Sequence, residues 1–160
     1  MSAHLRCLSF FVLGEPKAQP RAKAARIGGF VRMYTPASAK DWKASIRREA
    51  FLALEKQEDR SQLCGPLSVR LVFHFPRPKA HFNSKGIIKP GAPHWHVTKP
   101  DRDNCEKAVL DALGDLGLFK NDSQVCAGEV VKVYADARAG CSITIQELAD
   151  ATLDQTEGKA

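Results

Sequence analysis

The stretch KPDRDNCEKAVLDAL, residues 99–113, gathers acidic and basic side chains at the start of an expected helix. In an extended segment, side chains two positions apart point the same way. Asp101 and Asp103 therefore converge if the chain enters the helix extended, which Pro100 favours at Lys99. Two carboxylates on one side of a backbone can hold a hard divalent cation such as Mg²⁺. The pattern is compatible with a metal site that hydrolyses phosphodiesters.

The same residues also fit an ordinary helix start. Asp103 with Glu106 three residues later forms a capping-box pattern, and the helix dipole favours an acid there. Capping leaves Asp101 unexplained. Lys107, four residues after Asp103, either pairs with that carboxylate or stabilises charge on a phosphate during cleavage. Both interpretations remain open at this point.

Two further motifs bear on a metal site. Asp122 lies in the turn KNDSQV, where Asp is common for local reasons, but a fold that brought it beside the helix start would complete a three-carboxylate cluster. HWH, residues 94–96, has no further His or Cys at ligand spacing, so we interpret it as loop histidines near DNA. The chain lacks GxGxxG, Walker A, GxSxG and HExxH motifs, and no nucleotide cofactor is expected.

Charge is divided unevenly along the chain. Residues 1–99 hold 18 Lys and Arg against 6 Asp and Glu, whereas residues 100–160 hold 6 against 12. A basic surface beside an acidic cluster suits metal chemistry on a bound polyanion, although a solvated basic surface with an acidic tail has the same balance. The candidate phosphate contacts are Lys17, Arg21, Lys23, Arg26, Arg32, Lys40, Lys43, Arg77 and Lys79.

A small α+β domain must position these residues. Apolar patterns predict strands at 5–13, 30–35, 67–75, 124–135 and 142–147. A helix at about 37–57, beginning at Pro36, is predicted by the buried stripe Trp42, Ile46, Ala50 and Leu54. A second helix follows Asp103. We expect a two-layer fold in which two helices pack on one sheet.

The remaining segments are connections. Residues 15–29 are expected to form a basic loop, and residues 77–98 a long loop at the edge of the active face. The last two strands are expected to pair as a hairpin through ADARAG, residues 135–140. We expect one domain over residues 1–148 and a flexible polar tail at 149–160.

Composition indicates a soluble, cytoplasmic protein that does not contact a membrane. Apolar residues make up 44% and charged residues 26%, and no apolar run is long enough to span a bilayer. The N-terminal apolar run lacks a small-residue cleavage site, which favours a strand over a signal peptide. Five scattered cysteines are predicted to be small buried residues in a reducing compartment.

Together these motifs resemble the RusA family of Holliday junction resolvases. The pattern KPD-x-DN-x-x-K-x-x-x-DAL is matched at residues 99–113, and the resemblance continues downstream in FKNDSQV and EVVKVY. Upstream, GEPKAQPR, YTP and HFPRPKAHF extend the resemblance over about residues 10–145.

The resemblance implies a homodimeric, Mg²⁺-dependent endonuclease, with Mn²⁺ as a substitute, that nicks branched DNA at four-way junctions in paired strands. It implies a bacterial or prophage origin and a small mixed α+β fold whose dimer sets acidic sites beside a basic surface. The family's essential acids fall on Asp101, Asp103 and Asp122 as metal ligands, and its essential lysine on Lys107. Many relatives have Asp where this chain has Asn121, and Cys105 replaces a usual aliphatic residue.

Two other function classes remain as alternatives. A non-catalytic junction-binding or DNA-binding accessory protein of phage origin would have the same basic half, but the presence of all three acids and Lys107 argues against it. A DxD-type nucleotide-sugar transferase needs a larger nucleotide-binding domain than 160 residues readily supply.

Overall fold

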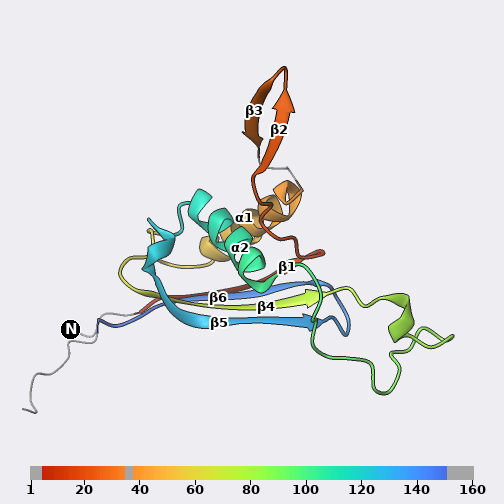
Figure 1. Ribbon diagram of the computed structural model, residues 1–160. Helices are drawn as coiled ribbons and strands as arrows, with labels where there is room; N and C mark the ends of the chain where they lie inside the picture. Colours follow the sequence, from red (N-terminus) through yellow and green to blue (C-terminus); the bar gives the residue numbers. More distant parts are fainter. Residues whose placement is uncertain (1–4, 35–37, 151–160) are drawn as a thin grey trace, which may run out of the picture.

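The computed structural model describes residues 5–34 and 38–150. A four-stranded sheet forms one layer, and two helices cover one of its faces (Figure 1). The two-layer α+β architecture predicted from the sequence is confirmed. The expected helix start at Pro36, part of the YTP motif and residues 151–160 of the expected tail lie outside the described residues.

The sheet is mixed. Across it the order is β1 (Cys7–Leu13), β6 (Gly140–Glu147), β4 (Leu67–Phe75) and β5 (Val125–Tyr134). β6 is antiparallel to both β1 and β4. β4 and β5 run parallel, because the chain returns through a helix between them. The side chains of β4 alternate between buried and less buried positions, as its apolar pattern predicted.

The last two strands do not form the expected hairpin. β6 lies between β1 and β4, and β5 takes the outer position beside β4. The helical crossover delivers β5 to the edge, whereas Cys141, Ile143 and Ile145 of β6 are almost fully buried and require a central strand. Residues 135–139 therefore connect across the end of β4, where Ala135 N donates to Phe75 O at 2.7 Å.

Two helices, α1 (Lys40–Glu55) and α2 (Arg102–Asp115), contribute the other half of the core. The stripe predicted for α1 is confirmed at Trp42, Ile46 and Ala50. α2 buries Cys105, Ala108, Val109, Ala112 and Leu113. Within the described ranges, no helix combines the length and apolar character that a membrane span requires.

All five cysteines are free, and only two are buried. Cys105 and Cys141 lie in the core, as predicted, but Cys7, Cys64 and Cys126 are exposed. The exposed three lie on outer strands or in loops, where neighbouring side chains do not cover them.

Residues 23–34 form a hairpin where a loop was predicted up to residue 29. β2 (Lys23–Ile27) pairs antiparallel with β3 (Phe30–Tyr34) around Gly28 and Gly29. Both glycines have positive φ, 59° and 82°, as a tight two-residue turn requires. The sequence AKAARI is poor in β-branched and aromatic residues, which is why β2 was not predicted. The hairpin projects away from the rest of the molecule (Figure 1).

The long loop after β4 is anchored at several points. It contains a 3₁₀ turn, η1 (Lys79–His81), and its last part pairs with the end of β5. There, Tyr134 N donates to His94 O at 2.8 Å and His96 N donates to Lys132 O at 3.2 Å. The loop therefore widens the sheet at the end where α2 begins.

Arg77 holds this loop from within. Its guanidinium donates to Ala135 O at 3.0 Å, Pro93 O at 2.7 Å and Asp136 Oδ1 at 2.9 Å. Only 4% of the Arg77 side chain is exposed. The predicted phosphate contact by Arg77 is therefore wrong, because its donors are used inside the fold.

Arg77→Ala should lower the free energy of unfolding by about 1 to 3 kcal/mol, because it leaves two backbone carbonyls without donors. Arg70→Ala is the matched control: it removes an exposed Arg70–Glu129 pair and should cost under about 1 kcal/mol. Urea unfolding of both variants measures the difference. Equal losses would contradict the internal role of Arg77.

Candidate active site

The start of α2 carries two of the predicted catalytic residues. Asp101 is the N-cap, with extended backbone (φ −68°, ψ 145°), and its carbonyl accepts a hydrogen bond from Cys105 N at 3.1 Å. Asp103 is already inside the first turn, so the extended backbone on which the expected convergence of the two carboxylates rested ends at Asp101. The predicted capping box at Asp103 is therefore wrong, because the helix begins at Arg102 and the cap makes no side-chain hydrogen bond. Both acids remain at a helix end whose dipole favours negative charge.

The Asp101 and Asp103 carboxylates are exposed and unneutralised. Within the described residues, neither forms a salt bridge. Both act on the Cys105 thiol, since burial raises the pKa of Cys105 to about 11, with Asp101 and Asp103 adding to the rise and Lys132 opposing it. Two oxygen-donor groups at the same helix end, without a salt bridge to a cationic side chain, suit a hard divalent cation.

Lys132 on β5 is a neighbour of this site that the sequence interpretation missed. Its Nζ donates to Thr98 O at 2.7 Å and lies 5.7 Å from the centroid of the Phe75 ring. Lys132 therefore ties the segment that precedes Asp101 to the sheet. In the sequence, the sign of this role was a single lysine between Val131 and Val133 in the stretch EVVKVY.

Lys107 lies one turn into α2 and is exposed. Its ion-pair partner is Asp111, at 3.6 Å, and not Asp103 as the spacing had suggested. Lys43 of α1 approaches the other oxygen of Asp111 at 3.8 Å. Asp111 is thus shared, and Lys107 keeps most of its ammonium surface toward solvent.

Asp122 lies at the far end of α2. It begins η2 (Asp122–Gln124) and lines a hollow of about 390 Å³ with Asp111, Asp115 and Lys43. The 14 residues of α2 span about 21 Å, and Asp122 follows the last turn of the helix whereas Asp101 precedes the first. In the ranges that the structure describes, no three His, Cys, Asp or Glu side chains are grouped to hold a metal ion. One chain therefore does not bring Asp122 beside the helix start.

The turn around Asp122 is fixed by its neighbours. Asn121 Oδ1 accepts from Ser123 N at 2.9 Å, and Gln124 Oε1 accepts from Lys120 N at 2.9 Å and Asn121 N at 3.0 Å. Gln124 Nε2 also donates to Gly65 O at 3.0 Å. Asn121 thus has a capping role, which explains how the turn is maintained without a second Asp.

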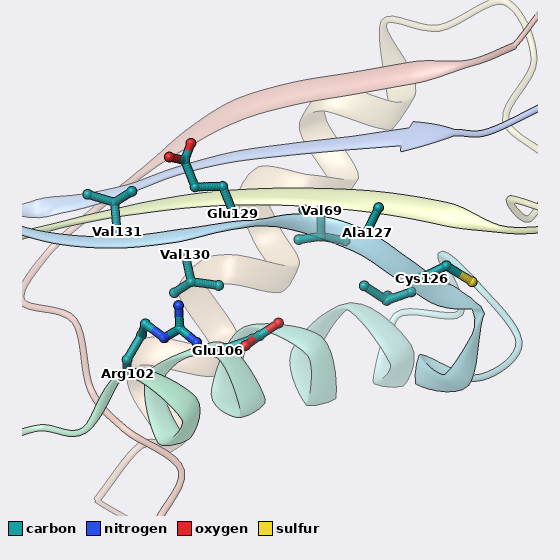
Figure 2. Close-up of a pocket in the computed structure, with 10 residues that line it drawn as sticks. Val69, Arg102, Glu106, Cys126, Ala127, Glu129, Val130 and Val131 are labelled. Atoms are coloured by element: carbon teal, nitrogen blue, oxygen red, sulfur yellow. The ribbon is translucent and has the colours of Figure 1, made fainter.

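A groove of about 600 Å³ runs between α2 and the outer strand β5. Figure 2 shows Arg102 at one end of this groove, next to Asp101 in sequence, and Cys126 at the other, close to η2. None of the three predicted acids is among its lining residues, although Arg102 lies between Asp101 and Asp103 in sequence. Glu106 and Glu129 are among its lining residues.

Most of the predicted phosphate contacts lie on exposed surface. Arg21, Lys23, Arg26 and Arg32 are exposed on the segment that forms the hairpin, and Lys40 and Lys79 are exposed where α1 and η1 begin. Lys17 pairs with Glu15 at 3.2 Å, and Lys43 is drawn toward α2 by Asp111. The hairpin segment, residues 16–34, is joined to the first turn of α2, because Gln19 N donates to Asn104 O at 2.8 Å.

The HWH histidines have aromatic neighbours. The His96 ring stacks on Phe75 with centroids 4.0 Å apart, and His94 packs edge-on against Trp95. Burial, reinforced by the charge of Lys132, lowers the pKa of His96. His96 therefore packs as a neutral ring beside the start of α2.

Gln124→Ala should destabilise the turn that carries Asp122, because one side chain supplies hydrogen bonds to several backbone groups. The expected loss is about 1 to 3 kcal/mol of unfolding free energy. Ser123→Ala, whose exposed side chain lies one position away, should change stability by less than about 0.5 kcal/mol. Urea unfolding compares the two, and an unchanged Gln124→Ala midpoint would contradict the role of this amide.

Comparison with known proteins identifies the family. The family model described as endodeoxyribonuclease RusA matches residues 14–146. An uncharacterized protein of Bacillus subtilis (strain 168), YqaN, is 36% identical over 140 residues, which cover 81% of this chain and 89% of that protein. The match contains the start of α2, the turn with Asp122 and the projecting hairpin. The resemblance drawn from the motifs is thus confirmed, and the chain belongs to the RusA family of endodeoxyribonucleases.

Proposed function

We propose that this protein is a Mg²⁺-dependent endonuclease that resolves four-way DNA junctions by paired, symmetric nicks during recombination and repair. The observation that carries the proposal is the exposed, unneutralised pair Asp101 and Asp103, in a member of an endodeoxyribonuclease family. A cationic segment starts beside the pair, where Gln19 N donates to Asn104 O at 2.8 Å. DNA attracted by these cations is thereby brought to the carboxylates.

Asp101 and Asp103 are the residues that would hold the metal ion. Their donors are all oxygen, which suits Mg²⁺ and also Mn²⁺. When bound, such an ion supplies positive charge to the scissile phosphate and lowers the pKa of water. Both residues lie at the N-terminal end of α2, where the helix dipole favours negative charge.

Lys107 is suited to stabilise negative charge that develops on the phosphate. It lies one turn beyond Asp103, and its Nζ is 3.6 Å from Asp111, which restrains the side chain without burying it. An ammonium placed near the phosphate oxygens on which charge develops favours the transition state over the ground state.

The third acid supports a dimeric site. Since α2 separates Asp122 from Asp101, a second copy of the chain must supply Asp122 if all three acids serve one metal site. Two copies related by a two-fold axis also provide two equivalent sites, one for each of the paired nicks. The homodimer is thus part of the proposed function.

A non-catalytic junction-binding protein is the alternative. The exposed cations would serve such a protein equally well. The separation of Asp122 from Asp101 and Asp103 within one chain also favours a non-catalytic role if the protein acts as a monomer. Metal-dependent cleavage by the wild-type protein would exclude this alternative, because a pure binder gains no activity from Mg²⁺.

Asp101→Asn and Asp103→Asn should each reduce cleavage of a four-way junction while leaving junction binding nearly unchanged. Loss of an outer partner of a metal ligand already costs about 10- to 100-fold, so loss of a direct ligand should cost about 100-fold or more. Asp41→Asn is a matched control, since Asp41 occupies the same place in the first turn of α1 as Asp103 in α2. Normal nicking by Asp101→Asn or Asp103→Asn would show that the acids are wrongly assigned.

Mixing variants tests the shared site. Asp101→Asn and Asp122→Asn chains are unfolded together in urea and refolded, which gives mixed dimers. If the acids of the two chains meet across the dimer, one of the two sites in each mixed dimer carries no substitution and the other carries both. About a quarter of wild-type sites should then be recovered, measured as junction nicks. If the mixture stays as inactive as each variant alone, the acids do not meet across a dimer.

A further inference from the structure

The projecting hairpin lies outside the hydrophobic core over residues 23–33. Its five residue pairs extend about 17 Å from the body of the protein (Figure 1). Over residues 23–33, whose side chains the structure describes, none belongs to the core cluster. A two-stranded hairpin alone is only marginally stable in water, so an exposed apolar hairpin is best explained by a partner that covers it.

The apolar character is strongest at the tip. Ile27 and Phe30 are directly opposite each other on either side of the Gly28–Gly29 turn, and they are 59% and 75% exposed. Directly opposite residues in an antiparallel pair share a face, so the two side chains form one apolar end. Nothing on the described chain covers this end.

Cations lie directly behind the tip. Arg32 is on the same face as Ile27 and Phe30, two positions back, and Arg26 is on the other face, opposite Val31. Residues 16–34 include five Lys and Arg and no Asp or Glu. The surface therefore combines an apolar end with flanking positive charge.

This combination fits DNA better than another protein surface. DNA offers stacked apolar bases between two rows of phosphates, and apolar side chains can enter a base step while Arg or Lys holds the phosphates. Entry is easiest at a branch point, where stacking is already interrupted. A second copy of this chain is a poorer partner than DNA, because its residues 1–99 carry 18 Lys and Arg against 6 Asp and Glu, whereas DNA carries negative charge along its whole length.

The root of the hairpin segment couples its tip to the acids. Pro16 is fully buried, and Gln19 N donates to Asn104 O at 2.8 Å, between Asp103 and Cys105 in sequence. Only three residues separate Gln19 from β2. DNA held at the tip is therefore held in a defined position relative to the start of α2.

We propose that Ile27 and Phe30 form a wedge that inserts between bases at the branch point of a DNA junction, with Arg26 and Arg32 on the flanking phosphates. This inference rests on the proposed function and adds to it the way in which branched DNA is distinguished from linear DNA. Insertion opens the base step, so the wedge also contributes to distortion of the junction.

The test measures binding without cleavage. Four-way junctions with 2-aminopurine at the branch point are titrated with protein in EDTA, and a linear duplex of equal length is the reference. The wild type should raise 2-aminopurine fluorescence and prefer the junction. Phe30→Ala and Ile27→Ala should lose the fluorescence rise and reduce the preference by about 10-fold, since base stacking on a side chain contributes substantially to affinity.

Val31→Ala is the matched control, because Val31 is an exposed apolar residue next to the tip but on the opposite face. It should keep both the fluorescence rise and the junction preference. If Phe30→Ala keeps the fluorescence rise and the junction preference as Val31→Ala does, Phe30 does not act as a wedge. If Phe30→Ala instead converts a dimer into a monomer in sedimentation, the tip binds a second copy and the proposal is overturned.

The wedge and the proposed nuclease activity are tested by different outcomes. Fluorescence and preference are measured without metal, so a wild type that opens the branch point but never cleaves would retain the wedge and reject the nuclease. A wild type that cleaves junctions while Phe30→Ala keeps the fluorescence rise would retain the nuclease and reject the wedge.

Discussion

The packing of α2 on the sheet determines where every candidate catalytic group lies. Cys105, Ala108 and Ala112 are small and fully buried, so the helix backbone lies close to the strands beneath it. Because α2 is held rigidly along its length, Asp101 and Asp103 stay at its first turn and the turn with Asp122 follows its last. A substitution that enlarged this buried stripe would move both ends together.

The Asp101 and Asp103 carboxylates, the contact from Lys132 and the root of the hairpin segment all meet at the start of α2. The carboxylate pair lies there without a cationic partner among the described residues, Lys132 fixes the approaching chain through Thr98, and the hairpin segment joins the first turn through Gln19. The helix dipole favours the two acids at this end, and without a cationic partner they are suited to a divalent cation brought by the substrate or the solvent. The proposed metal binding and the proposed attraction of DNA would therefore meet at the start of α2.

Local patterns predicted the local structure well. Period-two apolar alternation located β4, the stripe on α1 located its buried face, and the joint spacing of acids and Lys107 identified the family. Features decided by distant contacts were missed. The order of strands depends on which strand is most completely buried, the burial of Arg77 depends on carbonyls from two separate loops, and the position of Asp122 depends on the length of α2.

The most direct measurement of the central claim is the position of the nicks on a mobile four-way junction. Each strand is labelled in turn, the wild-type protein is added with Mg²⁺ or with EDTA, and the products are mapped on a denaturing gel. The account predicts nicks that appear only with Mg²⁺, at symmetric positions in two opposing strands. Unpaired nicks, equal cutting of linear duplex, or the absence of Mg²⁺-dependent products would contradict it.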